Sequence, residues 1–344
     1  MADADAKLPY TGQSNSTMTM GECRDFKRNP EIVIPPGYEH LVEPSQYKLV
    51  ETTMQKWSPQ VRSFMRFETG MKLAVAGKQH TVQITVKNYV PKSFDPIINL
   101  LNMVNWLLAE KRPLFLNLKA GTNMLVEYFN RNPNAKRQLG LHDDEIQIPS
   151  DFLGVLAKIL DKLPRWEIEM MALFRKINED VMGEYRPHSK AIALHWIPIA
   201  LIARGIEVSI EDLTLVVLAH EVAHAYTHVG MDIGGSWWET EAFIKTDRAV
   251  TEGLAQYFTF VFLAKHAKTE SAPGPLAAYR KLLEHQGPDY HTHLAWIDDH
   301  DDDDDVSLPP SEAIRLALLD GRIRGVCIDE FSANVAENKR RLRL

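Results

Sequence analysis

The sequence predicts an α+β fold that is mainly helical, with a small antiparallel β unit towards the N-terminus. Four stretches, at residues 49–54, 61–67, 71–75 and 81–86, read as strands. The last is the clearest, because apolar Val82, Ile84 and Val86 alternate with polar residues, which is the period of a half-buried strand. Beyond residue 95 the apolar residues instead recur at helical spacing, and a length of 344 residues allows one large or two medium domains.

Composition and periodicity divide the chain into three parts. Residues 1–43 are rich in Ser, Thr, Gly, Pro and charge, and we expect a flexible tail there. Residues 44–130 are expected to form a β-rich N-terminal subdomain, and residues 131–344 a mainly helical domain. Helices are predicted at residues 96–110, 123–130, 151–162, 166–182 and 311–320, with a surface loop at 132–145 near the boundary.

The charge distribution argues against a nucleic-acid partner. The net charge is −7, and the run from Asp298 to Asp305 alone holds seven aspartates. The remainder of the chain is therefore close to neutral and offers no basic field for a phosphate backbone. Because like charges repel, we expect the aspartate run to be a solvated loop.

Several sequence features indicate a cytoplasmic protein without a membrane partner. The N-terminal M-A-D-A-D-A-K lacks the basic and apolar regions of a secretory signal, and no apolar run reaches transmembrane length. Cys23 and Cys327 are far apart and form no C-x-x-C motif, which fits a reducing compartment. The oligomeric state stays open.

The most informative stretch is L-V-V-L-A-H-E-V-A-H-A-Y-T-H-V-G, in which His220, Glu221 and His224 form an H-E-x-x-H motif. Residues four apart lie one turn above each other on a helix, so both imidazoles can face one metal ion while Glu221 reaches a water on it. Ser209 and Asp212 provide a capping-box-like helix start, and Gly230 is a natural stop. The chemistry indicated is that of a zinc hydrolase.

A zinc site of this kind needs a third protein ligand. One candidate is Glu252 in the segment T-E-G-L-A-Q-Y-F, which lies 28 residues after His224. Asp247 can cap a second helix that runs through Glu252 to about Lys265.

The pair H-E-V-A-H and E-G-L-A-Q-Y-F resembles the gluzincin metallopeptidases, the thermolysin-like clan. The resemblance covers residues 183–263. It implies a zincin-like catalytic domain within residues 131–344, zinc bound by His220, His224 and Glu252, and a peptide or protein substrate. The small residues Gly253 and Ala255 would let the two helices approach closely. The resemblance also implies that a strand at 191–197 forms the edge of the sheet above the cleft, and a plain buried strand is the equal alternative.

Two features depart from that pattern. The thermolysin-like clan has an acid four residues after the third ligand, where this chain has Gln256, so an acid that orients a histidine must come from elsewhere. Glu239, Glu241 and Asp247 are candidates of equal rank. His228 lies one further turn along the ligand face and is a rim histidine or an additional ligand.

The related metzincin pattern does not fit. It requires glycine three residues after the second motif histidine and a third histidine three residues later. This chain has Thr227 and Gly230 at those positions.

A peptidase of this type also needs a donor for the oxyanion that forms during attack. The resemblance implies a Tyr or His from the region after the metal helices. Tyr290, His291 and His293 in the segment G-P-D-Y-H-T-H are the candidates, and the sequence does not distinguish them.

The function predicted is a zinc-dependent metallopeptidase in which Glu221 is the general base towards a zinc-activated water. One alternative is a regulatory peptidase specific for one partner protein, since the bacterial anti-repressor peptidases carry a similar motif pair. Another is a zinc-bound interaction module without turnover. The presence of Glu221 argues against the module, because a structural zinc site does not need that carboxylate.

Overall fold

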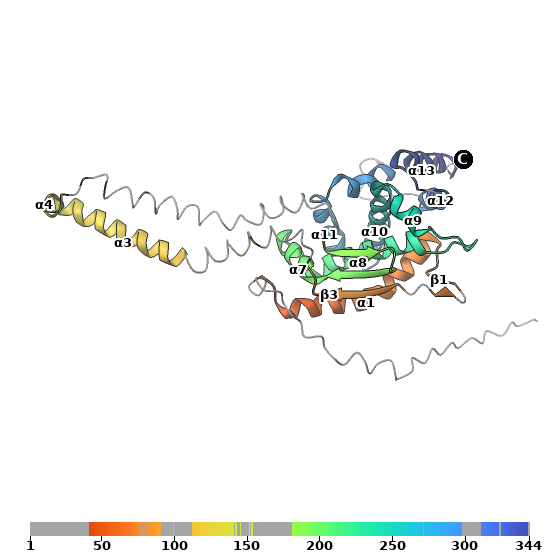
Figure 1. The fold of residues 1–344 in the computed structure, drawn as a ribbon, viewed down its shortest axis with the longest axis horizontal. Helices are drawn as coiled ribbons and strands as arrows, with labels where there is room; N and C mark the ends of the chain where they lie inside the picture. The colour runs from red at the N-terminus through yellow and green to blue at the C-terminus, as the bar shows by residue number, and fades with distance from the viewer. Residues whose placement is uncertain are drawn as a thin grey trace, which may run out of the picture. The chain divides into compact units, whose positions relative to one another are not determined.

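The computed structural model describes residues 41–75, 78–79, 82–90, 99, 112–140, 142, 145, 151, 153, 181–270, 272–297, 311–322 and 325–342. Within these residues the fold is a mainly helical α+β arrangement around a small three-stranded sheet (Figure 1). The predicted fold class is confirmed at this level.

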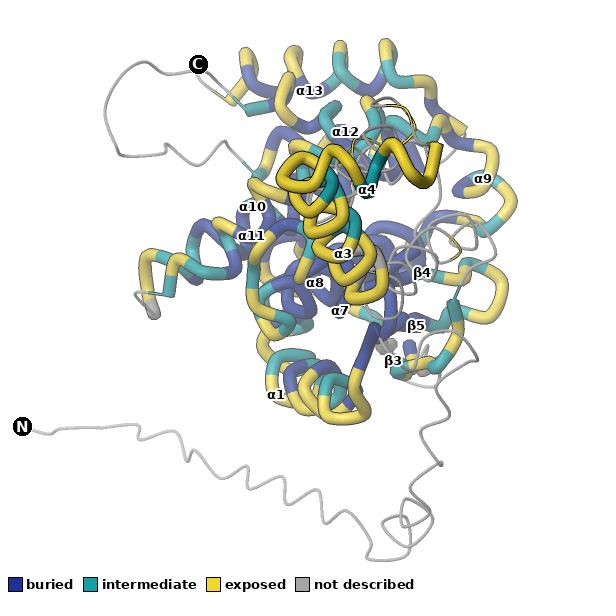
Figure 2. The backbone as a smooth tube through the Cα atoms, turned by 90° about the vertical axis from the view of Figure 1, so that its left-hand side faces the viewer, coloured by how far each residue is buried: buried dark blue, intermediate teal, exposed yellow. Residues whose placement is uncertain are grey.

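The central element is helix α8, Ile210–Val229, which carries the H-E-x-x-H motif. Its start is the one predicted: the Ser209 side chain accepts a hydrogen bond from the Asp212 backbone N–H at 2.9 Å. Every residue from Leu213 to Val229 is buried, and Figure 2 colours the helix accordingly. A helix buried on all faces must be surrounded by other elements, and α8 packs most extensively against α1 and α10.

The C-terminal end of α8 is held by a buried cation. Gly230 follows the helix with an extended rather than a left-handed backbone, and the position requires glycine because a Cβ there would lie 2.3 Å from the Tyr226 carbonyl oxygen. The Arg322 guanidinium donates to the carbonyl oxygens of Thr227 at 2.8 Å and Tyr226 at 3.3 Å. Burial lowers the pKa of Arg322 to about 10, so it remains charged at neutral pH, as suits a helix C-terminus.

Residues 44–69 form one long helix, α1 (Pro44–Thr69), and the two strands predicted at 49–54 and 61–67 are wrong. The buried positions Tyr47, Val50, Val61 and Met65 follow helical spacing rather than alternation. Pro44 occupies the first turn, and Pro59 is accommodated inside the helix. Gly70 ends α1 in the left-handed region, at φ +67°.

The three-stranded sheet joins segments that are distant in sequence. Its order is β3 (Gln83–Lys87), β5 (Ala191–His195), β4 (Gly183–Arg186). β3 runs parallel to β5, whereas β4 runs antiparallel to it. The predicted strand at 81–86 is thus confirmed, but it pairs with β5 instead of completing an antiparallel unit of its own. The N-terminal part also contains the short antiparallel hairpin of β1 (Ala74–Val75) and β2 (Lys78–Gln79), and Lys72 forms an isolated antiparallel bridge with Met231.

The remaining elements are helices. They are α3 (Arg112–Arg131), α4 (Pro133–Gln138), α7 (Trp196–Gly205), α9 (Thr240–Lys245), α10 (Arg248–Glu270), α11 (Gly274–Leu283), the 3₁₀ helix η5 (Pro288–Trp296), α12 (Ser311–Gly321) and α13 (Ile328–Leu342). The helices predicted at 123–130 and 311–320 are confirmed, whereas the loop predicted at 132–145 contains α4.

Other predictions fall mainly outside the described residues. These are most of the tail at 1–43, the helices at 96–110, 151–162 and 166–182, and the aspartate run. Of the helix predicted at 166–182 only Val181 and Met182 are described, and neither is helical. The division at residue 130 stays a prediction, although α1 and β3 contribute to the same packing as α8 and β5. In the part of the chain that is described, no helix is both long and apolar enough to cross a membrane.

The Arg322 contacts generate a stability prediction. Replacing Arg322 by Met removes the donors to the last turn of α8 and leaves buried carbonyl groups unsatisfied, so we expect the free energy of unfolding to fall by about 3 kcal/mol. Arg340→Met, on the exposed surface of α13, is the control and should change it by less than about 0.5 kcal/mol. Urea titration followed by circular dichroism measures both, and equal stabilities would contradict the role of Arg322.

Candidate functional site

Two helices bring the three predicted metal ligands together. His220 and His224 lie one turn apart on α8, and Glu252 faces them from α10. The Nε2 atoms of the two histidines are 3.1 Å apart, and Glu252 Oε2 lies 3.2 Å from that of His220 and 3.4 Å from that of His224. All three side chains are buried. This group of ligand atoms could hold a metal ion.

The carboxylate of Glu252 is charged despite its burial. Burial alone would raise its pKa, but the adjacent His224 and His220 outweigh that effect and hold the pKa well below its usual range. Glu252 Oε2 is directed at the histidines, whereas its Oε1 lies 3.6 Å from Arg248 Nε. The two oxygens therefore have different partners, which favours coordination through one of them.

The glycine after this ligand has a different role from the one expected. A Cβ on Gly253 would lie 2.7 Å from the Trp296 ring. Gly253 therefore allows η5, rather than α8, to approach α10 closely, and η5 is among the elements packed most extensively on α10.

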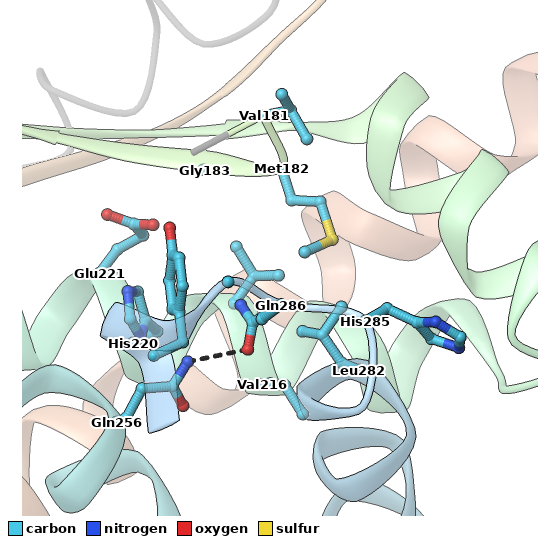
Figure 3. Close-up of a pocket in the computed structure, with 13 residues that line it drawn as sticks. Val181, Met182, Gly183, Val216, His220, Glu221, Gln256, Leu282, His285 and Gln286 are labelled. Carbon is cyan, nitrogen blue, oxygen red and sulfur yellow. Dashed lines mark hydrogen bonds between the residues drawn. The ribbon is translucent and has the colours of Figure 1, made fainter. Parts of the chain in front are cut away.

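Glu221 lies beside the ligand group and is 2% exposed. It faces strand β4: a Cβ on Gly183 would lie 2.8 Å from Glu221 Oε1 and 2.8 Å from Val217 Cγ1. Figure 3 shows the carboxylate directed towards Gly183. A residue larger than glycine at position 183 would therefore displace the side chain expected to act as general base.

A cavity of roughly 570 Å³, including its open mouth, adjoins His220 and Glu221 (Figure 3). Its walls come from α8, the start of β4, α10 and the segment from α11 to η5. The lining residues are Val181, Met182, Gly183, Val216, Val217, His220, Glu221, Gln256, Leu282, His285, Gln286, Gly287 and Tyr290. Most of its inner surface is apolar, with a few polar groups, as is usual for a ligand site.

Sequence reasoning missed most of this lining. Val216 and Val217 precede the motif by one turn, so helical spacing could have indicated them. The α11–η5 segment carries no comparable signal, because its place beside α8 depends on tertiary packing.

Of the three candidate oxyanion donors, Tyr290 lines the cavity. Its ring centroid is 6.0 Å from that of His220, and its hydroxyl accepts a hydrogen bond from Arg248 Nη2 at 3.1 Å. His291 Nδ1 lies 3.0 Å from the Gly287 carbonyl oxygen, and this residue is absent from the lining.

His293 is fully buried behind the cavity. Its Nδ1 lies 2.9 Å from the Tyr290 carbonyl oxygen and its Nε2 lies 2.7 Å from the Tyr279 hydroxyl. Because a carbonyl only accepts, Nδ1 carries the hydrogen and Nε2 accepts from Tyr279. Burial lowers the pKa of His293 to about 4, so the ring is neutral. These contacts make it a packing residue that supports Tyr290.

The predicted orienting acids occupy other positions. Asp247 caps α10, since its Oδ1 accepts from the Ala249 N–H at 3.2 Å and its Oδ2 from the Ile328 N–H at 3.4 Å. Glu239 and Glu241 belong to the start of α9. Gln256, which replaces the acid of the thermolysin-like pattern, donates to the Gln286 side chain at 3.0 Å and so ties α10 to the cavity wall.

His228 lies outside the ligand group and away from any rim. It is fully buried, its Nδ1 is 2.9 Å from the Tyr185 hydroxyl, and its ring stacks on Phe243. Burial lowers its pKa to about 3. His228 therefore joins β4, which carries Tyr185, to α8.

Comparison of the chain with protein-family models, with curated proteins and with solved structures found no significant match.

The buried, neutral His293 generates a pH prediction. Its pKa is about 6.5 in an unfolded chain and about 4 in the folded protein. Between these pH values the unfolded state binds the proton more strongly than the folded state. The contribution of His293 to the free energy of unfolding is therefore constant above pH 6.5 and falls by up to about 3 kcal/mol as the pH drops to 4.

We expect His293→Gln to reduce this slope, because glutamine does not titrate, and His188→Gln, at an exposed position, to leave it unchanged. Urea unfolding at a series of pH values measures both variants. Parallel pH dependences for His293→Gln and the wild type would contradict the buried neutral state.

Proposed function

We propose that the protein is a zinc-dependent metallopeptidase. The observation that carries this proposal is the convergence of two imidazole nitrogens and one carboxylate oxygen, with Glu221 beside them at the edge of a cavity. A metal-assisted hydrolase requires these parts together: three protein ligands, a base and access for a substrate.

The donor set and its dimensions fit zinc. Two histidine nitrogens and one carboxylate oxygen are common ligands of catalytic zinc. Bonds of about 2.0–2.1 Å in a tetrahedron place neighbouring ligand atoms about 3.3–3.4 Å apart. The three separations here are 3.1, 3.2 and 3.4 Å, close to that value.

Bound zinc would polarise the scissile carbonyl and lower the pKa of a water molecule to about 7. Glu221 is the general base: its carboxylate accepts a proton from the attacking water and delivers one to the leaving amine nitrogen. Tyr290 donates its phenolic hydrogen to the carbonyl oxygen as negative charge develops there. The apolar lining, including Val217 and Leu282, receives a substrate side chain and excludes water.

Strand β4 is the element best placed to bind the substrate backbone. The resemblance implied this role for residues 191–197, with a plain buried strand as the equal alternative. β5 is the central strand of the sheet, and β4 is at its edge within the described residues. β4 begins at Gly183, which lines the cavity next to Glu221. A peptide could add to this edge through main-chain hydrogen bonds.

The cavity also favours a peptidase over an interaction module without turnover. A structural zinc site is closed by four protein ligands, whereas the group formed by the described residues supplies three and adjoins an accessible space.

The first prediction of this proposal concerns metal content. Purified protein should contain about one zinc per chain by elemental analysis, since structural and catalytic zinc sites bind one ion through such a group. His220→Ala, His224→Ala and Glu252→Ala should each lose it, while His188→Ala, an exposed histidine in the turn between β4 and β5, should retain it. Full zinc retention in Glu252→Ala would refute the ligand assignment.

The second prediction separates catalysis from metal binding. Glu221→Gln preserves the size of the side chain but cannot accept a proton, so zinc content and thermal stability should be retained while peptide hydrolysis falls by at least about a hundredfold. A peptide library analysed by mass spectrometry provides the measurement. Wild-type cleavage rates in Glu221→Gln would disprove the general-base role, and a wild type that cleaves nothing would disprove the peptidase proposal.

A further inference from the structure

Arg248 connects the third ligand to the candidate oxyanion donor. It precedes Glu252 by one turn of α10, and its Nε lies 3.6 Å from Glu252 Oε1, the oxygen directed away from the histidines. Its Nη2 donates to the Tyr290 hydroxyl at 3.1 Å. Asp289 Oδ2, 4.0 Å from the same Nε, helps to hold the guanidinium in place.

We propose that Arg248 is a positioning residue for catalysis, which directs the Tyr290 hydroxyl to the reacting carbonyl and fixes the orientation of the Glu252 carboxylate. This inference rests on the proposed peptidase function. Arg248 lies outside the H-E-x-x-H motif, which gives no indication of its role. The sequence pattern predicted an acid that orients a motif histidine, whereas Arg248 is a partner of the Glu252 carboxylate.

The hydrogen-bonding chemistry of arginine determines how this works. A guanidinium has only donors, so in the contact with Tyr290 the phenol oxygen must accept. The hydroxyl has a single hydrogen, and the contact with Arg248 does not use it, so the phenol can act as a donor to a substrate oxygen while it accepts from Arg248. The positive charge of Arg248 also polarises the phenol, so that it becomes a stronger donor where charge develops.

The geometry of arginine is needed as well as its charge. The planar fork reaches Glu252 through Nε and Tyr290 through Nη2 at once. Lysine has one nitrogen and can replace only one of these contacts. A lysine that stays beside Glu252 therefore separates the support of the ligand from the positioning of Tyr290.

The test compares Arg248→Met, Arg248→Lys, Tyr290→Phe and the two double variants with the wild type. Arg280→Met, on the exposed face of α11, is the matched control. Zinc content is measured first.

We expect Arg248→Lys to retain zinc and an unchanged KM, while kcat falls by about ten- to a hundredfold. This is the effect of losing a charge-assisted hydrogen bond that acts in the transition state. In the Tyr290→Phe background the same substitution should lower kcat by less than about threefold, because the two residues act as a unit.

A second readout does not depend on turnover or on metal. In metal-free protein labelled with ¹³C at the tyrosine Cζ, the Tyr290 signal is identified by its loss in Tyr290→Phe. It should shift in Arg248→Met and remain unchanged in Arg280→Met, since the Cζ resonance responds to hydrogen bonding at the phenol oxygen.

The outcomes distinguish this inference from the proposed function. Wild-type kcat in zinc-loaded Arg248→Lys, or equal losses with and without Tyr290, would overturn the positioning role while the peptidase stands. A wild type without peptidase activity would refute the proposed function, and with it the catalytic role of Arg248. An unshifted Tyr290 signal in Arg248→Met would refute the contact itself.

Discussion

The site depends on placing a cluster of polar groups between two helices whose buried side chains are mostly apolar. His220, His224 and Glu252 are all buried, and each presents a lone pair to the same small volume. Buried polar groups are costly unless they are paired, so a proton or a cation between them is a physical requirement. The hydrogen bonds among the three side chains can satisfy it without metal, and a bound cation satisfies it with all three in their metal-binding forms.

The elements around α8 and α10 maintain this arrangement through a few close contacts. Gly183 admits the Glu221 side chain under β4, and Gly253 admits the Trp296 ring of η5 against α10. Arg322 satisfies the last carbonyl groups of α8. In each case a segment distant in sequence packs against α8 or α10. A larger residue at either glycine, or the loss of the Arg322 donors, would therefore shift the helix or side chain that carries a candidate ligand or base.

The cavity results from the same packing. The α11–η5 segment is held on one side by Gln256 and Gln286 and is supported from behind by the buried pair of Tyr279 and His293. Tyr290 thereby lines the space next to His220, with Arg248 fixing its hydroxyl. The proposed donor, base and ligands thus come from η5, α8 and α10, and the first residue of β4, Gly183, lines the same cavity.

The sequence by itself determined the features that depend on local spacing. The i, i+4 pair of histidines, the Ser209 cap of α8 and the Asp247 cap of α10 could be predicted because a helix fixes the relation of residues a few positions apart. The same local reasoning was wrong for residues 49–67, where short apolar runs around Pro59 resembled strands but form part of α1. Only the tertiary structure decided the pairing of β3 with β5, the edge position of β4 and the presence of Tyr290, rather than His291 or His293, in the cavity lining. Each of these features depends on contacts between segments that are far apart in the sequence. Hydrophobic burial drives those contacts, and because it is non-directional, a local sequence pattern does not specify which segment packs against which.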